Sequence, residues 1–279
     1  MEKIKELKKQ FKKLNLDGYL VPKNDEFFGE YIPENKDNLK FISNFSGSYG
    51  FALILKKKNY LFVDGRYTLQ AKMQSEKLFN IITIPNKFPS DIIKNKKLKI
   101  GFDPKLHTES MLKRLFHNSC FKLIGVTENL IDNIWKQRKN IKFKKFFMLS
   151  DKNAGQTFKN KINKLSKLLD KNNINLQFVS APENIAWLLN LRGGDSEFTP
   201  MPNGYLTLDN KNNVYFFCNL KKITKKIRNN LKKIKIIDIK YINLFLNKII
   251  NKKIQIDKNS CSIFYKNILN KHNKIIEIE

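Results

Sequence analysis

The chain has 279 residues, of which 41% are hydrophobic and 22 are phenylalanine. This length suits one large folded domain or two ordinary ones, and the aromatic content excludes a disordered chain of this charge density. A formal net charge of +29 raises the question of nucleic-acid binding.

The basic residues are mostly lysine. Of the 54 basic residues only five are arginine, namely Arg66, Arg114, Arg138, Arg192 and Arg228. Nucleic-acid surfaces usually concentrate arginine for forked contacts to phosphates and bases. Here lysine is instead spread along the chain beside abundant Asn and Ile. The pattern favours a bias in composition, so nucleic acid is the disfavoured partner.

The lack of a recognisable targeting signal and the spacing of the cysteines bear on the cellular compartment. No stretch approaches the roughly 18 apolar residues of a membrane span, and the amino terminus has no apolar secretory segment. The three cysteines, Cys120, Cys218 and Cys261, are scattered singly without a CxxC pair. We therefore expect a cytoplasmic protein with no membrane partner and with buried free thiols.

The first half of the chain combines helices with strands. Apolar residues at helical spacing predict a helix over 4–14, which Asp17-Gly18 ends. A helical exit over 128–137 and a basic linker over 138–145 are expected at the end of this half. The strands expected here are, in chain order, 19–21, 51–55, 60–63, 99–103 and 123–126.

The second half repeats this order. A helix is predicted over 158–169, and the expected strands are 176–179, 205–208, 214–217, 253–257 and 275–278. The repeat predicts two tandem domains, 1–140 and 141–279. Each is expected to be an α/β domain with a mixed sheet covered by helices, because its hairpin requires antiparallel pairing. No GxGxxG or GxxxxGK[ST] string is present, so no phosphate-binding loop of the usual kind is expected.

Three strings are more specific than the repeat. Residues 62–71 have the sequence FVDGRYTLQA, residues 180–195 have SAPENIAWLLNLRGGD, and residues 128–135 have ENLIDNIW. They resemble the amino-terminal domains of aminopeptidase P, the Xaa-Pro aminopeptidase of the creatinase/prolidase superfamily. The resemblance extends, in the same order, to 18–22, 30–33, 45–50 and the region of Pro200.

The resemblance covers essentially the whole chain and implies a fold. It implies two tandem mixed-sheet domains, creatinase N-terminal-like and of ribonuclease H-like architecture, flanked by helices. Family members of this longer type continue into a catalytic domain of the pita-bread fold, which is absent from these residues. We therefore expect the non-catalytic amino-terminal portion of a cytoplasmic Xaa-Pro aminopeptidase, which shapes substrate access and assembly.

The family's reaction implies cofactors that this chain is not expected to bind. Two divalent metals, usually manganese, are held there by two Asp, one His and two Glu, and they generate the attacking hydroxide. His107, His117 and His272 form no HxxE or HxxH arrangement, so none of these ligands can be placed here. His107 and His117 are expected to be solvated or capping residues. The resemblance implies peptides with proline second as substrates, bound through the catalytic domain, and it allows a homodimer.

No catalytic residue is expected in the chain, but two strings contain candidates for substrate positioning, namely Arg66, Tyr67, Arg192 and Asp195. The fork of Arg66 could bind a peptide carboxylate or carbonyl by paired hydrogen bonds. Alternatively, Asp64 caps the following helix and Arg66 pairs with a nearby carboxylate. For Arg192 the alternative is an ion pair with Asp195 or Glu197.

The remaining motif residues are expected to be structural. Trp187 and Trp135 are predicted to pack, the second by anchoring the exit helix against the first domain. Ser46 and Ser48 have no base nearby in sequence, which argues against a serine nucleophile. Two other functions stay open: a stand-alone module that binds proteins or peptides, and a lysine-rich nucleic-acid binder.

Overall fold

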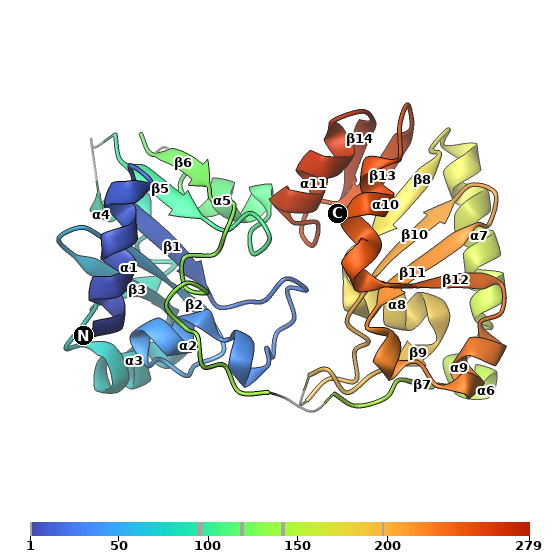
Figure 1. Cartoon of the computed structure of the whole chain (residues 1–279), viewed down its shortest axis with the longest axis horizontal. Coiled ribbons are helices and arrows are strands. Elements are labelled where there is room, and N and C mark those ends of the chain that lie inside the picture. Colours follow the sequence, from blue (N-terminus) through green and yellow to red (C-terminus); the bar gives the residue numbers. More distant parts are fainter. Residues whose placement is uncertain (1, 94–96, 118–119, 141–142, 197) are drawn as a thin grey trace. The chain divides into compact units, whose positions relative to one another are not determined.

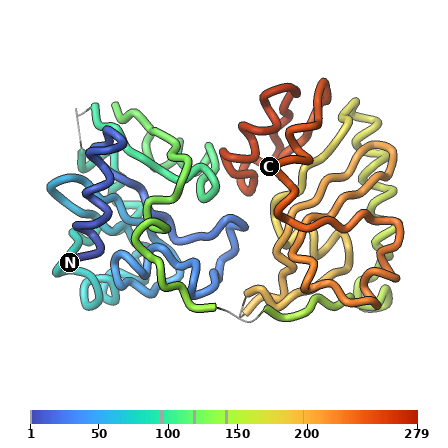
Figure 2. Tube along the Cα trace, viewed as in Figure 1, coloured from blue at the N-terminus to red at the C-terminus, as the bar shows by residue number. Residues whose placement is uncertain are grey.

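The computed structural model of the protein describes residues 2–93, 97–117, 120–140, 143–196 and 198–279. The chain divides into two compact units: the first comprises Met1–Glu26 and Glu34–Asn140, and the second Phe27–Pro33 and Ile141–Glu279. Figure 2 traces the first unit mainly in blue to green and the second mainly in yellow to red. Two positions of the predicted basic linker, 141 and 142, lie outside the described residues.

The first unit is built on a six-stranded mixed sheet with the order β4-β3-β2-β1-β5-β6. Its strands are β1 Gly18–Pro22, β2 Gly50–Leu55, β3 Asn59–Asp64, β4 Asn80–Ile84, β5 Lys99–Phe102 and β6 Lys122–Gly125. β2 pairs antiparallel with β1 and β3, while the other neighbours are parallel. The amino end of β2 therefore lies at the same edge of the sheet as the carboxyl ends of the other strands.

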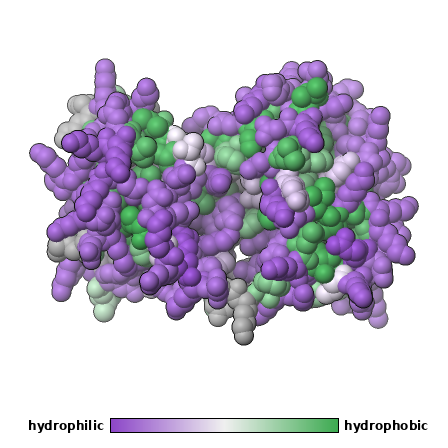
Figure 3. Space-filling model, viewed as in Figure 1, coloured by the Kyte–Doolittle hydropathy of each residue, from purple (hydrophilic) through white to green (hydrophobic). Residues whose placement is uncertain are grey.

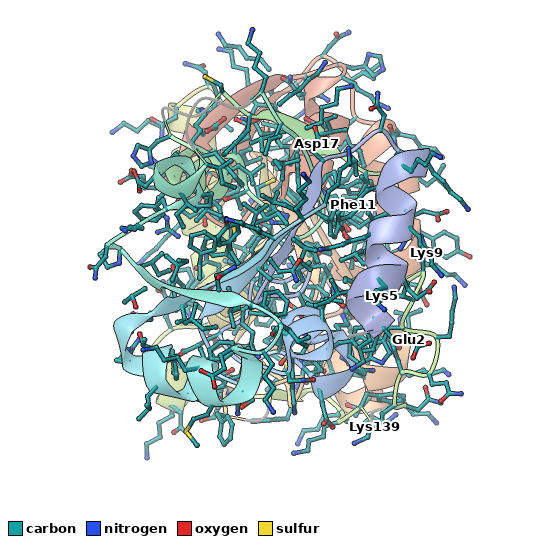
Figure 4. All side chains as sticks on the ribbon, turned by 90° about the vertical axis from the view of Figure 1, so that its left-hand side faces the viewer. Glu2, Lys5, Lys9, Phe11, Asp17 and Lys139 are labelled. Atoms are coloured by element: carbon teal, nitrogen blue, oxygen red, sulfur yellow. The ribbon has the colours of Figure 1, made fainter. Side chains whose placement is uncertain are left out.

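Helices flank this sheet (Figure 1). In the described part of the unit they are α1 Glu2–Lys13, α2 Asn38–Ser43, α3 Thr68–Ser75, α4 Pro89–Ile92 and α5 Glu109–Leu115, with 3-10 turns η1 Glu34–Lys36 and η2 Gly65–Tyr67. In α1, Leu7 and Phe11 are buried whereas Lys5 and Lys9 are exposed. Figure 4 shows both lysines on the outer side of α1 and Phe11 on the inner side. The predicted helix over 4–14 is thus confirmed.

The predicted exit helix over 128–137 is wrong, because this segment forms turns instead. The amide of Ile131 donates to the side chain of Asn129 at 2.9 Å, a local bond that competes with helix formation. Trp135 stacks on Phe41, with ring centroids 4.5 Å apart. Packing of Trp135 against the first unit is therefore confirmed, but the packing stabilises an irregular segment.

The second unit repeats the topology of the first. Its strands are β8 Leu176–Val179, β10 Tyr205–Asp209, β11 Val214–Cys218, β12 Ile234–Asp238, β13 Lys253–Asp257 and β14 Lys274–Ile278. Their order in the sheet, β12-β11-β10-β8-β13-β14, matches that of the first sheet strand for strand. β10 is again the antiparallel strand, paired with β8 and β11. The predicted repeat and the predicted class, two mixed sheets flanked by helices, are confirmed.

The second sheet buries apolar side chains on both faces. The described helices of this unit are α6 Asp151–Ala154, α7 Phe158–Lys171, α8 Pro182–Leu189, α9 Lys225–Asn230, α10 Ile242–Asn247 and α11 Ile263–Asn270, with 3-10 turns η3 Leu220–Lys222 and η4 Ile239–Tyr241. One core cluster includes residues of α7, α8 and α9, and another includes residues of α10 and α11. The short strands β7 Phe147–Met148 and β9 Leu191–Arg192 form a separate pair. Among the described helices none is both long and apolar enough to cross a membrane.

Two features of the fold were not among those predicted from the sequence. Strands β4 and β12 lie at the edges of their sheets, where most of their residues are only partly buried. In addition, the segment Phe27–Pro33 belongs to the second unit. There the ring of Phe27 stacks on Tyr205 at 5.2 Å and joins the cluster that includes α10 and α11.

Candidate functional site

The first motif follows the carboxyl end of β3. Asp64 caps the turn η2, since its Oδ1 accepts hydrogen bonds from the backbone amide of Arg66 at 3.0 Å and from Arg66 Nε at 2.9 Å. These two bonds hold the pKa of the Asp64 carboxyl below its usual value, the side-chain bond having the larger effect. The cap and the local ion pair expected as an alternative are therefore present. The Arg66 side chain is nonetheless 76% exposed.

Tyr67 is positioned by the loop before β2. Its hydroxyl bonds that of Ser48 at 2.8 Å, and its ring stands edge-on to Phe45 with centroids 6.0 Å apart. Gly47 permits this packing, because a Cβ at that position would lie 2.3 Å from Phe45 Cζ and 3.0 Å from Tyr67 Cδ1. The glycine of this loop therefore serves ring packing.

Ser46, in the same loop, is held by amide side chains. Its hydroxyl accepts bonds from Gln70 Nε2 at 2.9 Å and Gln74 Nε2 at 3.0 Å, both from α3. An amide nitrogen is a hydrogen-bond donor and cannot take a proton as a general base does. These contacts connect the loop to α3 and provide no means of activating the hydroxyl.

A hollow of about 440 Å³ lies beside Arg66 in the first unit. Its polar lining residues include Tyr49, Arg66 and Arg114, and its apolar lining residues include Pro85 and Phe88. Arg114 Nη2 donates to the Tyr49 hydroxyl at 3.3 Å. Sequence reasoning missed Arg114 and Tyr49. The scarcity of arginine was the available signal, since two of the five arginines line this one hollow.

The second motif contains helix α8 and its end. Asn190 ends the helix with a left-handed backbone conformation, φ 52°. Arg192 Nη1 donates to the Ala186 carbonyl at 2.8 Å, and Lys161 Nζ donates to the Trp187 carbonyl at 2.8 Å. Two cations thus satisfy carbonyls at the negative end of the helix dipole. Burial, and then the charge of Arg192, lower the pKa of Lys161.

Asp195 is also engaged locally, but not by Arg192. Its carboxylate pairs with Lys222, and its Oδ2 accepts from the backbone amide of Asn203 at 2.8 Å. Both side chains of the ion pair are largely buried, at 4% and 13% exposure. The expected ion pair between Arg192 and Asp195 is therefore wrong, because Arg192 caps α8 instead. Its alternative partner, Glu197, lies outside the described residues.

Trp187 differs from its prediction as a packing residue, because 57% of it is exposed. The helical conformation explains this, since Ile185, Leu188 and Leu189 share the buried face and Trp187 lies on another. Lys161 Nζ lies 4.6 Å from the centroid of the Trp187 ring. The exposed tryptophan ring therefore lies over the ammonium group of the buried Lys161.

The histidines differ from one another. His107 is fully buried, its Nδ1 bonded to the Asp103 carbonyl at 2.8 Å and its ring edge-on to Phe102. The prediction that it is solvated or capping is therefore wrong. His117 is exposed, and its Nδ1 bonds the Arg114 carbonyl at 3.2 Å just beyond the end of α5. Within the described ranges, no group of three or more His, Cys, Asp or Glu residues is placed so that it could hold a metal ion.

The cysteines are free, but only two of them are buried. Cys218 and Cys261 lie in the interior of the second unit, whereas Cys120 is exposed. Burial raises the pKa of the Cys218 thiol to about 12. The expectation of buried thiols is thus wrong for Cys120, which lies two residues before the partly exposed edge strand β6.

The predicted substrate-positioning residues fall into two local groups. Arg66 and Tyr67 lie in the first unit next to the hollow, with the guanidinium carbon 5.7 Å from the tyrosine ring centroid. Arg192 and Asp195 lie in the second unit on either side of Gly193 and Gly194. Hydrophilic residues cover most of the visible surface (Figure 3).

Comparison with known sequences shows two tandem matches. A sequence model described as the creatinase/prolidase N-terminal domain matches residues 3–134, and a second model with the same description matches residues 137–279. The probable Xaa-Pro aminopeptidase P of Laccaria bicolor is 30% identical over 93% of the chain and 42% of its own length. Xaa-Pro aminopeptidase 1 of Dictyostelium discoideum is 32% identical over 82% of the chain and 39% of its own length. The chain thus spans about two-fifths of these relatives.

Among solved structures, the X-prolyl aminopeptidase of Caenorhabditis elegans shares the fold. The similarity has a TM-score of 0.89 at 21% identity and covers all of this chain and 50% of that one. That protein is described as a cytosolic enzyme with a di-nuclear active site. The match extends over both units, so two sheets of this fold also follow one another along the longer chain of that protein.

Proposed function

Since the chain belongs to the creatinase/prolidase N-terminal domain family, we propose that it is the non-catalytic amino-terminal part of a Xaa-Pro aminopeptidase. Such an enzyme releases the first residue of peptides that have proline second. The two domains, 1–140 and 141–279, would shape substrate access to a catalytic domain and support its assembly. The main support for this proposal is the tandem pair of N-terminal-domain matches, together with relatives that are named as Xaa-Pro aminopeptidases.

The chemistry is assigned to the catalytic domain of such an enzyme. The paired metals, manganese by the family resemblance, would be bound there and would supply the attacking hydroxide. We propose the cytoplasm as the place of action, which is supported by the description of the C. elegans protein as cytosolic. A homodimer is part of the same proposal, as an assembly of the whole enzyme.

The two groups of motif residues would contribute differently. Arg66 offers an exposed guanidinium next to the hollow, and Tyr67 packs behind it, so this pair would contact the peptide. Arg192 and Asp195 are engaged with α8 and with Lys222. They would act by holding the loop at Gly193 and Gly194 in place.

Hydrolysis by the chain alone tests the non-catalytic assignment. The chain is incubated with manganese and the peptide Arg-Pro-Pro, and release of the first arginine is measured. We expect no release above the rate without protein. Turnover that chelation of the metal abolishes would refute the assignment.

A chimera tests the positive part of the proposal. The corresponding amino-terminal region of the Dictyostelium relative is replaced by this chain, and cleavage of Arg-Pro-Pro is measured. We expect chelator-sensitive cleavage, with a KM that Arg66→Gln raises about tenfold while kcat stays unchanged. Arg228→Gln, which removes an exposed arginine from α9, is the control and should leave KM unchanged. A folded chimera that cleaves nothing would contradict the proposal.

A further inference from the structure

The hollow in the first unit is built at one edge of the sheet. Tyr49 immediately precedes β2, while Arg66 follows β3 and Pro85 follows β4. The carboxyl ends of β3 and β4 are adjacent there, since Asp64 is the register partner of Ile84. The last turn of α5 completes the lining with Arg114. Ligands of α/β proteins commonly bind outside the carboxyl ends of strands, where several segments converge in this way.

Arg114 and Tyr49 together present hydrogen-bond donors. A guanidinium is always charged and only donates, so the Tyr49 hydroxyl must accept the bond from Arg114 Nη2 at 3.3 Å. The proton of the Tyr49 hydroxyl is then left to donate elsewhere. Within the described ranges no carboxylate lies at ion-pair distance from Arg114. Tyr49 is 45% exposed and Arg114 is exposed as well, so both donors are accessible.

The rest of the lining sets the charge and polarity of the hollow. Asp64 and Arg66 form an ion pair at 2.9 Å, so their formal charges cancel and the charge of Arg114 remains. Ile84, Pro85 and Phe88 supply apolar surface next to these polar groups. A ligand with an anionic head and an apolar body would match both kinds of surface.

We propose that this hollow binds the oxyanion of a small organic ligand, with Arg114 and the Tyr49 hydroxyl as the donors. The two groups can hold two oxygens of one carboxylate, a geometry that lysine does not reproduce. The oxyanion site does not depend on the proposed function. Only the choice of a peptide carboxylate as the bound oxyanion rests on that function. Inorganic phosphate is the alternative oxyanion that the same donors could bind.

Arginine side-chain NMR tests the site directly, because the chain contains only five arginines. The whole chain is labelled with ¹⁵N-arginine, and the Nε–H signal of Arg114 is assigned from the variant Arg114→Lys. The peptide Ala-Pro-Phe, its carboxy-terminal amide and inorganic phosphate are titrated separately. We expect the free peptide to shift the Arg114 signal saturably and the amide to leave it unchanged. No hydrolysis is involved, so failure here is separate from failure of the proposed function.

Variants connect the signal to the two donors. Arg114→Gln should weaken peptide binding about tenfold or more, since a hydrogen bond to a charged group is lost. Tyr49→Phe removes one hydroxyl and should weaken it about threefold to tenfold. Arg228→Gln is the matched control, because it removes the same charge from an exposed arginine of the second unit and leaves the hollow intact.

The outcomes separate the alternatives. Phosphate binding that depends on Arg114 without peptide binding would support the oxyanion site and exclude a peptide as its ligand. Peptide binding without phosphate binding would support a carboxylate site. Shifts of all five arginine signals without saturation would indicate attraction to the net positive charge only and would overturn the proposal. An Arg114 signal that none of the three probes moves would overturn it as well.

Discussion

The imidazole of His107 is fully buried in the first unit. Its Nδ1 bonds the Asp103 carbonyl at 2.8 Å, so Nδ1 carries the proton, and its Nε2 has no hydrogen-bond partner among the described residues. Burial lowers the pKa of His107 to about 4. The charged form therefore has no favourable environment at this position.

A pH-dependent loss of stability follows. The pKa of His107 is lower in the folded state than the ordinary 6.5, so only the unfolded state gains a proton between about pH 6.5 and 4. Stability should fall in this window as the pH falls, by about 3 kcal/mol. Urea unfolding at pH 7 and pH 4 measures it. His107→Gln, which does not titrate, should lose about 3 kcal/mol less over this range, and an equal loss would show that His107 is not responsible.

Thiol reactivity provides a second test at the level of single residues. Cys120 is exposed, whereas Cys218 and Cys261 are buried and the pKa of Cys218 is raised to about 12. Because the thiolate is the reactive form, the native chain should show one fast thiol with a disulfide reagent and two more after denaturation. Cys120→Ser should abolish the fast phase. A fast phase that persists in this variant would mean that a buried thiol is accessible.

Single residues also show the limit of sequence reasoning. The cap by Asp64 and its pairing with Arg66 could be predicted, because both contacts are local in the chain. The partner of Asp195 could not, since Lys222 follows two strands later. Arg114 and Tyr49 were missed for the same reason, because only the fold brings α5 to the start of β2.

At the level of elements, the residue just before the first sheet strand of each unit, in chain order, makes the same two hydrogen bonds. Before β1, Asp17 donates its amide to the Lys99 carbonyl at 2.8 Å and accepts from the Lys99 amide through Oδ2 at 3.0 Å. Before β8, Asn175 makes the same two bonds with Lys253, at 3.0 and 2.8 Å. The shared feature is a side-chain oxygen that accepts a hydrogen bond. In addition, the Asp17 carboxylate forms an ion pair with Lys56, with 2.7 Å between Oδ1 and Nζ.

Two substitutions should separate the oxygen from the charge. Asp17→Asn keeps the acceptor and loses a partly exposed ion pair, so it should cost less than about 1 kcal/mol. Asp17→Ala leaves the Lys99 amide without its acceptor and should cost about 1–3 kcal/mol. Urea unfolding of the two variants and of Asn175→Ala measures the difference. Equal costs for Asp17→Asn and Asp17→Ala would show that the ion pair carries the effect.

Elements with strong periodicity could be predicted, and others could not. Helices α1 and α7 and the central hairpins follow from apolar spacing and turn residues. The segment 128–137 has apolar residues at helical spacing too, yet the side chain of Asn129 forms a local turn and the segment packs without a helix. Periodicity indicates which residues are buried, whereas the competing side-chain bond decides the backbone conformation.

At the scale of the whole molecule, one segment of the first half of the chain belongs to the second compact unit. Phe27–Pro33 lies between two parts of the first unit in sequence but belongs to the second. Phe27 is 7% exposed and stacks on Tyr205 at 5.2 Å, and Tyr31 meets Phe198 edge-on at 4.9 Å. The internal repeat gives no indication of this, because the segment has no counterpart in the second half.

Phe27→Ala in the whole chain should therefore destabilise the second unit by about 3 kcal/mol, since a buried aromatic ring is removed from its core. Hydrogen exchange followed by mass spectrometry can locate the effect. We expect faster exchange in β8, β10 and α11, with β2 and β3 unchanged. Phe51→Ala is the matched control, because Phe51 is 3% exposed and stacks on Phe62 at 4.6 Å in the first unit. It should accelerate exchange in β2 and β3 only. Faster exchange in β2 and β3 after Phe27→Ala, with the second unit unaffected, would assign the segment to the first unit instead.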